Sequence, residues 1–149
     1  MKLEIELVPS TVWFSNVRKL VPKTVWDMIR KKSYIVASHK CQICGNDGIL
    51  HCHEIWEYDD EKHIQNLKGF VALCENCHMI KHIGFSMYTL EGQEKFDKNE
   101  LIEHFCKVND CKIEDFYKHE KEAFKIWHER SKHKWKQDFG EYSKFIKSD

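Results

Sequence analysis

The sequence predicts an α+β fold in which a β-hairpin and the helix that follows it lie between helical flanks. Two apolar runs, ILHCHEIW and GFVALC, stand on either side of the polar stretch YDDEKHIQN, which is the pattern of two strands joined by a loop. Helical periodicity precedes this hairpin over residues 23–38 and returns at residues 99–107 and 113–135. A chain of 149 residues suits one domain, which we expect to span residues 1–149.

The composition excludes two classes of protein. With 42% hydrophobic and 13% aromatic residues, the chain is too apolar for a disordered tail, and no apolar run approaches the roughly 18 residues of a membrane span. The opening stretch MKLEIELVPSTVW lacks the continuous apolar region of a signal peptide. We therefore expect a cytoplasmic protein in a reducing compartment, with no membrane partner.

The chain begins with an N-terminal arm, residues 1–37. Leu3, Ile5 and Leu7 alternate with charged residues, which predicts a short strand at the start of the arm. A helix is predicted after Pro22, where apolar residues recur near helical spacing.

Turn residues and a helical tail bound the hairpin. Gly and Asn residues at positions 45–48 precede the first strand, and a helix is predicted from Cys77. Residues 94–149 form the predicted C-terminal helical region. Six residues of its last helix share one face, which favours packing of the two tryptophans in the core over stacking on bases. These residues are Phe116, Ala123, Phe124, Trp127, Ser131 and Trp135.

Two Cys-x2-Cys pairs flank the hairpin and predict a structural zinc site. The pairs are Cys41 with Cys44 and Cys74 with Cys77. Each pair can bring both sulfurs to one ion from a turn, and together they complete the tetrahedral thiolate site that zinc prefers. Such a site has no open position and would tie the hairpin to the next helix. The alternative is a pair of unrelated reduced or redox-active motifs. The remaining cysteines, Cys52, Cys106 and Cys111, have no partner at ligand spacing.

Three histidines predict a second metal site. His78 and His82 stand four residues apart, which places them on one face of a helix. His53 is the best third ligand, because the zinc site would draw its strand to the start of that helix. Three protein ligands leave coordination positions for a phosphate oxygen and water. A lone histidine is usually a surface or core residue, but three beside a predicted zinc site favour a functional centre.

In this order, CQICG, LHCHEIW and LCENCHMIKH resemble the zinc-stapled HNH endonucleases. The resemblance covers roughly residues 38–85 and implies a ββα-metal fold, a β-hairpin followed by a helix, embedded in N- and C-terminal helices. The flanking stretches IRKKSY and WHERSKHKWK look like those of larger HNH-like proteins of phages and bacteria. The family acts on DNA with a divalent cation, so the resemblance implies a nuclease.

Carried over by position, the resemblance implies a role for each motif residue. The four cysteines would be structural zinc ligands, and His53, His78 and His82 would hold the catalytic cation. Two positions depart from the family pattern: Glu54 stands where the general-base histidine normally follows the first ligand, and Gly69 stands where the family has an asparagine.

Glu54 and His51 are therefore the two candidates for the general base. Phosphodiester hydrolysis requires a group that takes a proton from the attacking water, and histidine suits this role because its pKa lies near neutral pH. A carboxylate is a weaker base unless burial raises its pKa. Strand alternation directs His51 and His53 to one face and Glu54 to the other. We expect Glu54 to be the base, or else a metal ligand, with His51 as the second candidate.

The net charge of zero conceals basic arms around an acidic middle. Residues 1–40 contain eight basic and three acidic residues, residues 41–111 contain six and thirteen, and residues 112–149 contain ten and eight. The arms could contact DNA phosphates, although lysines on a helix usually form only a solvated face. The candidate contacts are Arg30, Lys31, Lys32, Lys132, Lys134 and Lys136.

Together these patterns predict a metal-dependent HNH-type endonuclease that hydrolyses phosphodiester bonds of duplex DNA. Its cofactors would be a structural zinc ion and a divalent cation at the histidine site, such as Mg²⁺, Mn²⁺, Ni²⁺ or Zn²⁺. The alternative is a zinc-stapled module that binds nucleic acid or protein without cleaving it, an interpretation favoured by Glu54 and Gly69. Sequence specificity, cleavage pattern and oligomeric state have no signature in the chain.

Overall fold

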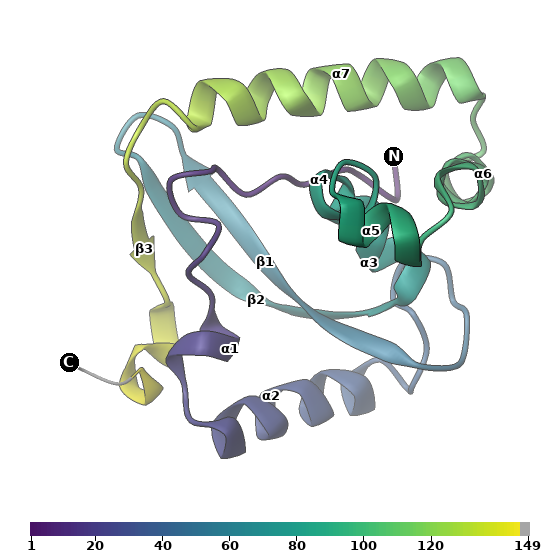
Figure 1. The fold of residues 1–149 in the computed structure, drawn as a ribbon. Coiled ribbons are helices and arrows are strands. Elements are labelled where there is room, and N and C mark those ends of the chain that lie inside the picture. The colour runs from purple at the N-terminus through teal and green to yellow at the C-terminus, as the bar shows by residue number, and fades with distance from the viewer. Residues whose placement is uncertain (147–149) are drawn as a thin grey trace.

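The computed structural model describes residues 1–146 and has an α+β fold built on a three-stranded sheet (Figure 1). The predicted fold class is thus confirmed at the level of α+β. The elements in chain order are α1 (Val17–Leu20), α2 (Lys23–Val36), β1 (Leu50–Asp59), β2 (Ile64–Cys74), α3 (Glu75–Lys81), α4 (Ile83–Ser86), α5 (Leu90–Lys95), α6 (Lys98–Asn109), α7 (Ile113–Arg130), β3 (Lys136–Asp138) and the 3₁₀-helix η1 (Gly140–Phe145).

The predicted hairpin is present and is followed at once by α3. β1 pairs antiparallel with β2, starting with Leu50 opposite Cys74. The register shifts between Ile55 and Trp56, where Gly69 on the opposite strand has a φ of +149° that side-chain-bearing residues rarely adopt. β3 pairs parallel with β2, so β1 is an edge strand of the sheet.

The hairpin lies between two apolar cores. α2 lies on one side of the hairpin, and α7 and the N-terminal segment lie on the other (Figure 1). The core on the α2 side includes Val17, Val21, Trp26, Ile29 and Leu67. The core on the opposite side joins the N-terminal segment to α3, α6 and α7, and its fully buried members include Leu3, Leu73, Ile80, Phe105 and Phe116. Each face of the hairpin is therefore fixed by its own set of helices.

The predicted N-terminal strand is wrong. Residues 2–8 form no strand, and the backbone bends at Leu3. Leu3 and Ile5 are buried, which explains the alternating pattern, yet their backbone N–H groups bond to side chains of α6 and α7. Glu6 bonds to the carbonyl of Lys81 at the end of α3. The segment alternates because every second residue enters the core, while its backbone has helices rather than a strand as neighbours.

The predicted helices are confirmed, with one change at the C-terminal end. α2 starts directly after Pro22, and α6 and α7 cover the two later periodic stretches. α7 ends at Arg130 rather than near Trp135, because the chain turns back and the Trp135 indole Nε1–H donates to the Arg130 carbonyl over 2.8 Å. β3 follows within the region predicted as helical, 94–149, of which residues 147–149 lie outside the described part.

Both tryptophans of the C-terminal region pack against the protein, as expected. Trp135 is buried, and Trp127 is half-buried with its Nε1–H donating to the carbonyl of Val8 over 2.9 Å. Among residues 1–146, no helix combines the length and apolar character needed to cross a membrane.

Candidate metal centres

Four cysteine sulfurs gather at the junction of the hairpin and α3. Cys41 and Cys44 lie in the turn before β1, Cys74 ends β2 and Cys77 lies in the first turn of α3; their sulfurs all lie within 4.8 Å of one another. In each pair the backbone N–H of the second cysteine points at the sulfur of the first, at 3.5 Å for Cys44 and 3.4 Å for Cys77. Both turns are thus shaped to present two sulfurs to one point.

The donor set of this cysteine cluster fits a zinc ion. The sulfurs of Cys44 and Cys74 are 3.6 Å apart, close to the roughly 3.8 Å expected for two thiolates about 2.3 Å from one tetrahedral ion. Hydrogen bonds from Cys74 and Cys77 lower the pKa of Cys41. The hydrogen bond to Cys41 raises the pKa of Cys74 to about 12. All four can be thiolates only beside a cation, so the cluster could hold a metal ion such as zinc.

His104 of α6 contacts the cysteine cluster, which the sequence did not predict. Its Nε2 lies 3.2 Å from the sulfur of Cys77. Burial lowers the pKa of His104, which favours a neutral ring that can donate one N–H to a thiolate. No spacing signal relates residue 104 to the Cys-x2-Cys pairs, because the contact depends on the packing of α6 against α3.

The three predicted histidines also come together. One nitrogen of each of His53, His78 and His82 lies within 4.8 Å of the others. His53 projects from β1, and His78 and His82 lie one turn apart at the end of α3. Nδ1 of His53 is 3.2 Å from Nε2 of His82. These contacts define the histidine cluster.

The chemistry of the histidine cluster suits a divalent cation. Two imidazole nitrogens each about 2.0–2.1 Å from one ion would be separated by roughly 3 Å, which matches the 3.2 Å between His53 and His82. Burial, aided by the neighbouring histidines, lowers the pKa of His78 to about 2 and that of His82 to about 3. Neutral rings with available lone pairs are the ligand form of histidine.

The two candidate bases occupy different positions around this cluster. His51 lies on the histidine side of β1, as predicted, with its Nδ1 2.9 Å from Nδ1 of His78. Glu54 alternates to the opposite face of β1, which it shares with Cys52 and the core on the α2 side. Within residues 1–146, its Oε2 is buried without a hydrogen-bond partner. Burial raises the pKa of Glu54 to about 7, although the backbone N–H of Val17 and the Trp56 side chain lower it in part.

A cleft of about 580 Å³ joins the histidine cluster to Glu54. Because β1 is an edge strand, side chains from both of its faces reach this one cleft. Arg18 and Arg130 are its cationic lining residues. Arg130 is held by Asp60 through two contacts of 2.9 and 3.0 Å, whereas Arg18 makes no ion pair within the described residues. The cluster thus opens onto a space that could admit a substrate.

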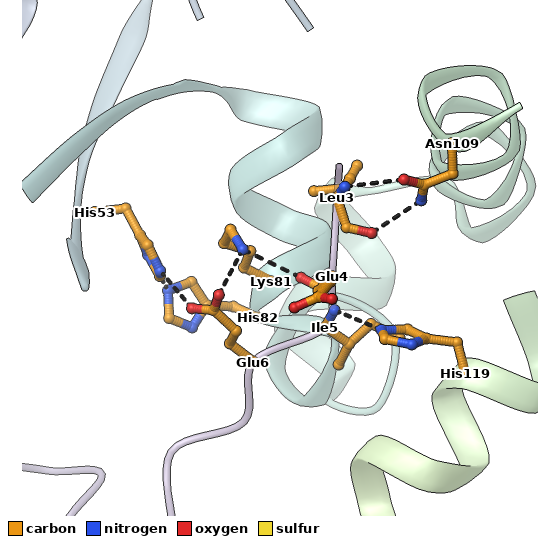
Figure 2. A network of polar contacts seen from close by, with 9 residues as sticks. All are labelled: Leu3, Glu4, Ile5, Glu6, His53, Lys81, His82, Asn109 and His119. Atoms are coloured by element: carbon orange, nitrogen blue, oxygen red, sulfur yellow. Dashed lines mark hydrogen bonds and ion pairs between the residues drawn. The ribbon is translucent and has the colours of Figure 1, made fainter. Parts of the chain in front are cut away.

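Glu6 and Lys81 complete the surroundings of the histidine cluster, and the sequence predicted neither of them (Figure 2). Glu6 Oε2 lies 3.5 Å from Nε2 of His53, and Glu6 Oε1 lies 2.8 Å from Nζ of Lys81. Burial raises the pKa of Glu6, but His53 and Lys81 together lower it more, to about 2. The only local signal was the charge alternation around Glu6, which had indicated a strand.

The six predicted DNA contacts remain a prediction. Two of them are already paired, Arg30 with Asp27 at 3.0 Å and Lys132 with Glu129 at 2.8 Å. The other four, Lys31, Lys32, Lys134 and Lys136, are exposed.

No protein-family model, curated protein or solved structure matches the chain. Any functional assignment therefore depends on the geometry of the two clusters and the cleft.

Proposed function

We propose that this protein is an HNH-type endonuclease that hydrolyses phosphodiester bonds of DNA. The observation that supports the proposal is that one hairpin and helix hold two different ligand clusters, one closed and one open to a cleft. The cysteine cluster supplies four protein ligands and leaves no position for substrate. The histidine cluster supplies three and opens onto a cleft. A purely structural role would not need this second, open set of ligands.

The residues of the cleft have complementary roles in this proposal. His53, His78 and His82 would hold a divalent cation, whose chemistry is to neutralise the charge that grows on the phosphate and the leaving 3′-oxygen. Glu54 lines the same cleft and would accept a proton from the attacking water. Arg18, free of an ion pair in the described chain, would contact a phosphate of the substrate.

Plasmid cleavage tests the proposal directly. The zinc-loaded protein is incubated with supercoiled plasmid and Mg²⁺, Mn²⁺ or Ni²⁺, and nicked and linear products are followed on a gel. We expect cleavage by the wild type and its loss in His78→Ala. His128→Ala is the matched control, because His128 is exposed on α7 and belongs to neither cluster. Equal cleavage by His78→Ala and wild type would overturn the assignment.

The second candidate is a zinc-stapled module that binds nucleic acid without cleaving it. Its specific support is the placement of Glu54 on the far face of β1 from the histidines, together with glycine at position 69. In that case DNA would be retarded in a gel-shift assay at low salt, and no cation would lead to cleavage. The plasmid assay therefore separates the two functions.

A further inference from the structure

The two ring nitrogens of His53 face different partners. Nδ1 faces His82 within the histidine cluster, and Nε2 faces the carboxylate of Glu6 outside it (Figure 2). A neutral imidazole has an N–H donor on one ring nitrogen and a lone pair on the other, and a carboxylate oxygen can only accept a hydrogen bond. The carboxylate therefore selects the tautomer with hydrogen on Nε2, which leaves the lone pair of Nδ1 directed into the cluster.

Glu6 is held in this position by a buried lysine. The Lys81 side chain is only 8% exposed, and its Nζ donates to Glu6 Oε1 over 2.8 Å and to the Glu4 carbonyl over 3.3 Å. Within residues 1–146, Glu6 is the only acidic side chain in ion-pair range of Lys81. The backbone N–H of Glu6 donates in turn to the Lys81 carbonyl over 3.3 Å. Lys81 thus fixes both the side chain and the backbone of Glu6.

The arm that carries Glu6 is itself anchored at two further points (Figure 2). The Asn109 side chain accepts from the N–H of Leu3 and donates to its carbonyl, each over 2.9 Å. His119 accepts from the N–H of Ile5 over 2.9 Å. Since Leu3 and Ile5 are also buried, the position of Glu6 is determined by packing as well as by its ion pair.

We propose that Glu6 is the positioning residue of the histidine cluster: it orients His53 so that Nδ1 binds the divalent cation, and Lys81 keeps Glu6 in place. This inference rests on the proposed function in one respect, that the cluster binds a cation. Carboxylates that accept from a metal-bound histidine commonly change metal affinity by roughly 10–100-fold when removed. The N-terminal arm thereby belongs to the metal centre, although it supplies no ligand.

Cobalt binding tests the inference without relying on cleavage. Zinc-loaded protein is titrated with Co²⁺ and followed by calorimetry and by the visible absorption of bound cobalt. We expect Glu6→Gln to bind Co²⁺ roughly 10–100-fold more weakly than wild type. Glu4→Gln is the matched control, because the Glu4 side chain lies two residues away, is exposed and makes no hydrogen bond to any residue from 1 to 146. Its Co²⁺ affinity should equal that of the wild type.

A second variant guards against a folding artefact. Glu6→Gln leaves Lys81 buried without its counter-ion, so the double variant Glu6→Gln/Lys81→Met, which removes both charges, is measured beside it. Long-range ¹H–¹⁵N NMR of the cobalt-free protein reports the tautomer directly: Nε2–H at His53 in the wild type and a tautomer mixture in both variants.

The outcomes are distinct. A wild type that binds no cation beyond its zinc refutes the histidine cluster as a metal site, and with it the proposed function. A wild type that binds Co²⁺, while a folded Glu6 variant binds it equally tightly and keeps the Nε2–H tautomer, refutes the role of Glu6 alone. Weakened binding with a mixed tautomer, and an unaltered Glu4→Gln, supports that role.

Discussion

The cysteine cluster and the histidine cluster share a hairpin and a helix but differ in how they are completed. All four cysteines lie within residues 41–77, and their two turns point the sulfurs inward by local hydrogen bonds. The histidine cluster takes its ligands from residues 53–82 but depends on Glu6 for orientation and on the cleft for access. The cysteine cluster is thus built locally, whereas the surroundings of the histidine cluster require distant parts of the chain.

Removing a ligand from each cluster should give the largest contrast. Cys77→Ser should lose the zinc, which in small zinc domains contributes on the order of 10 kcal/mol, comparable with the whole stability of a domain. We expect loss of the cooperative thermal transition and of zinc by elemental analysis. His82→Ala should retain zinc and the transition but lose the second cation. Cys52→Ser is the control for cysteine loss, because Cys52 lies outside the cluster. A stable Cys77→Ser protein that retains its zinc would contradict the contrast.

The next effect concerns the two candidate bases on either side of β1. Glu54→Gln removes the proton acceptor while keeping the shape of the side chain, and we expect cleavage to fall by roughly 10²–10⁴-fold. His51→Ala should reduce cleavage less, because His51 contacts His78 but does not line the cleft. Single-turnover cleavage rates at saturating cation measure both. The reverse order of effects would make His51 the base.

His104→Ala should weaken the cysteine cluster by a smaller amount. It removes the 3.2 Å contact to the Cys77 sulfur but no ligand, so we expect zinc affinity to fall by about 10-fold. Competition with a chromogenic chelator measures the change, and His128→Ala again serves as the control. Unchanged zinc affinity in a folded His104→Ala protein would limit the cluster to its four sulfurs.

The smallest effect is expected at the loop of the hairpin, where Asp60 pairs with Arg130. Asp60 is 60% exposed, so Asp60→Asn should lower the free energy of unfolding by less than about 1 kcal/mol. Its hydrogen bond to Arg130 lowers the pKa of Asp60 below 3.8. The contribution is therefore present at neutral pH and is lost as the pH falls below that value. Urea denaturation of the wild type and Asp60→Asn, at neutral pH and at a pH well below 3.8, measures this contribution. An equal difference in the free energy of unfolding at the two pH values would refute the ion pair as its cause.

The parts of the fold that the sequence predicted are those with a local pattern. The strands and helices α2, α6 and α7 follow from alternation and helical periodicity, and the ligand pairs follow from turn and helix spacing. The same reasoning failed for residues 3–7, because alternation reports which side chains are buried and not what the backbone bonds to. It missed β3, a three-residue strand, KQD, without apolar alternation.

The supporting residues of the two clusters were missed for a different reason. Glu6 meets His53, and His104 meets Cys77, only after segments distant in the sequence have packed together. Lys81 is buried, and its ammonium group contacts Glu4 and Glu6 of the N-terminal arm. Contacts of this kind leave no periodicity in a single sequence.

The anchoring of the N-terminal arm to Asn109 and His119 also sets an order of events during synthesis. Leu3 and Ile5 cannot dock until α6 and α7 have emerged from the ribosome, more than a hundred residues later. The cysteine cluster needs only residues 41–77 and can assemble while the rest of the chain is still being made. We therefore expect the nascent protein to bind a metal ion at the cysteine cluster early, and at the histidine cluster only after α7 has been synthesised.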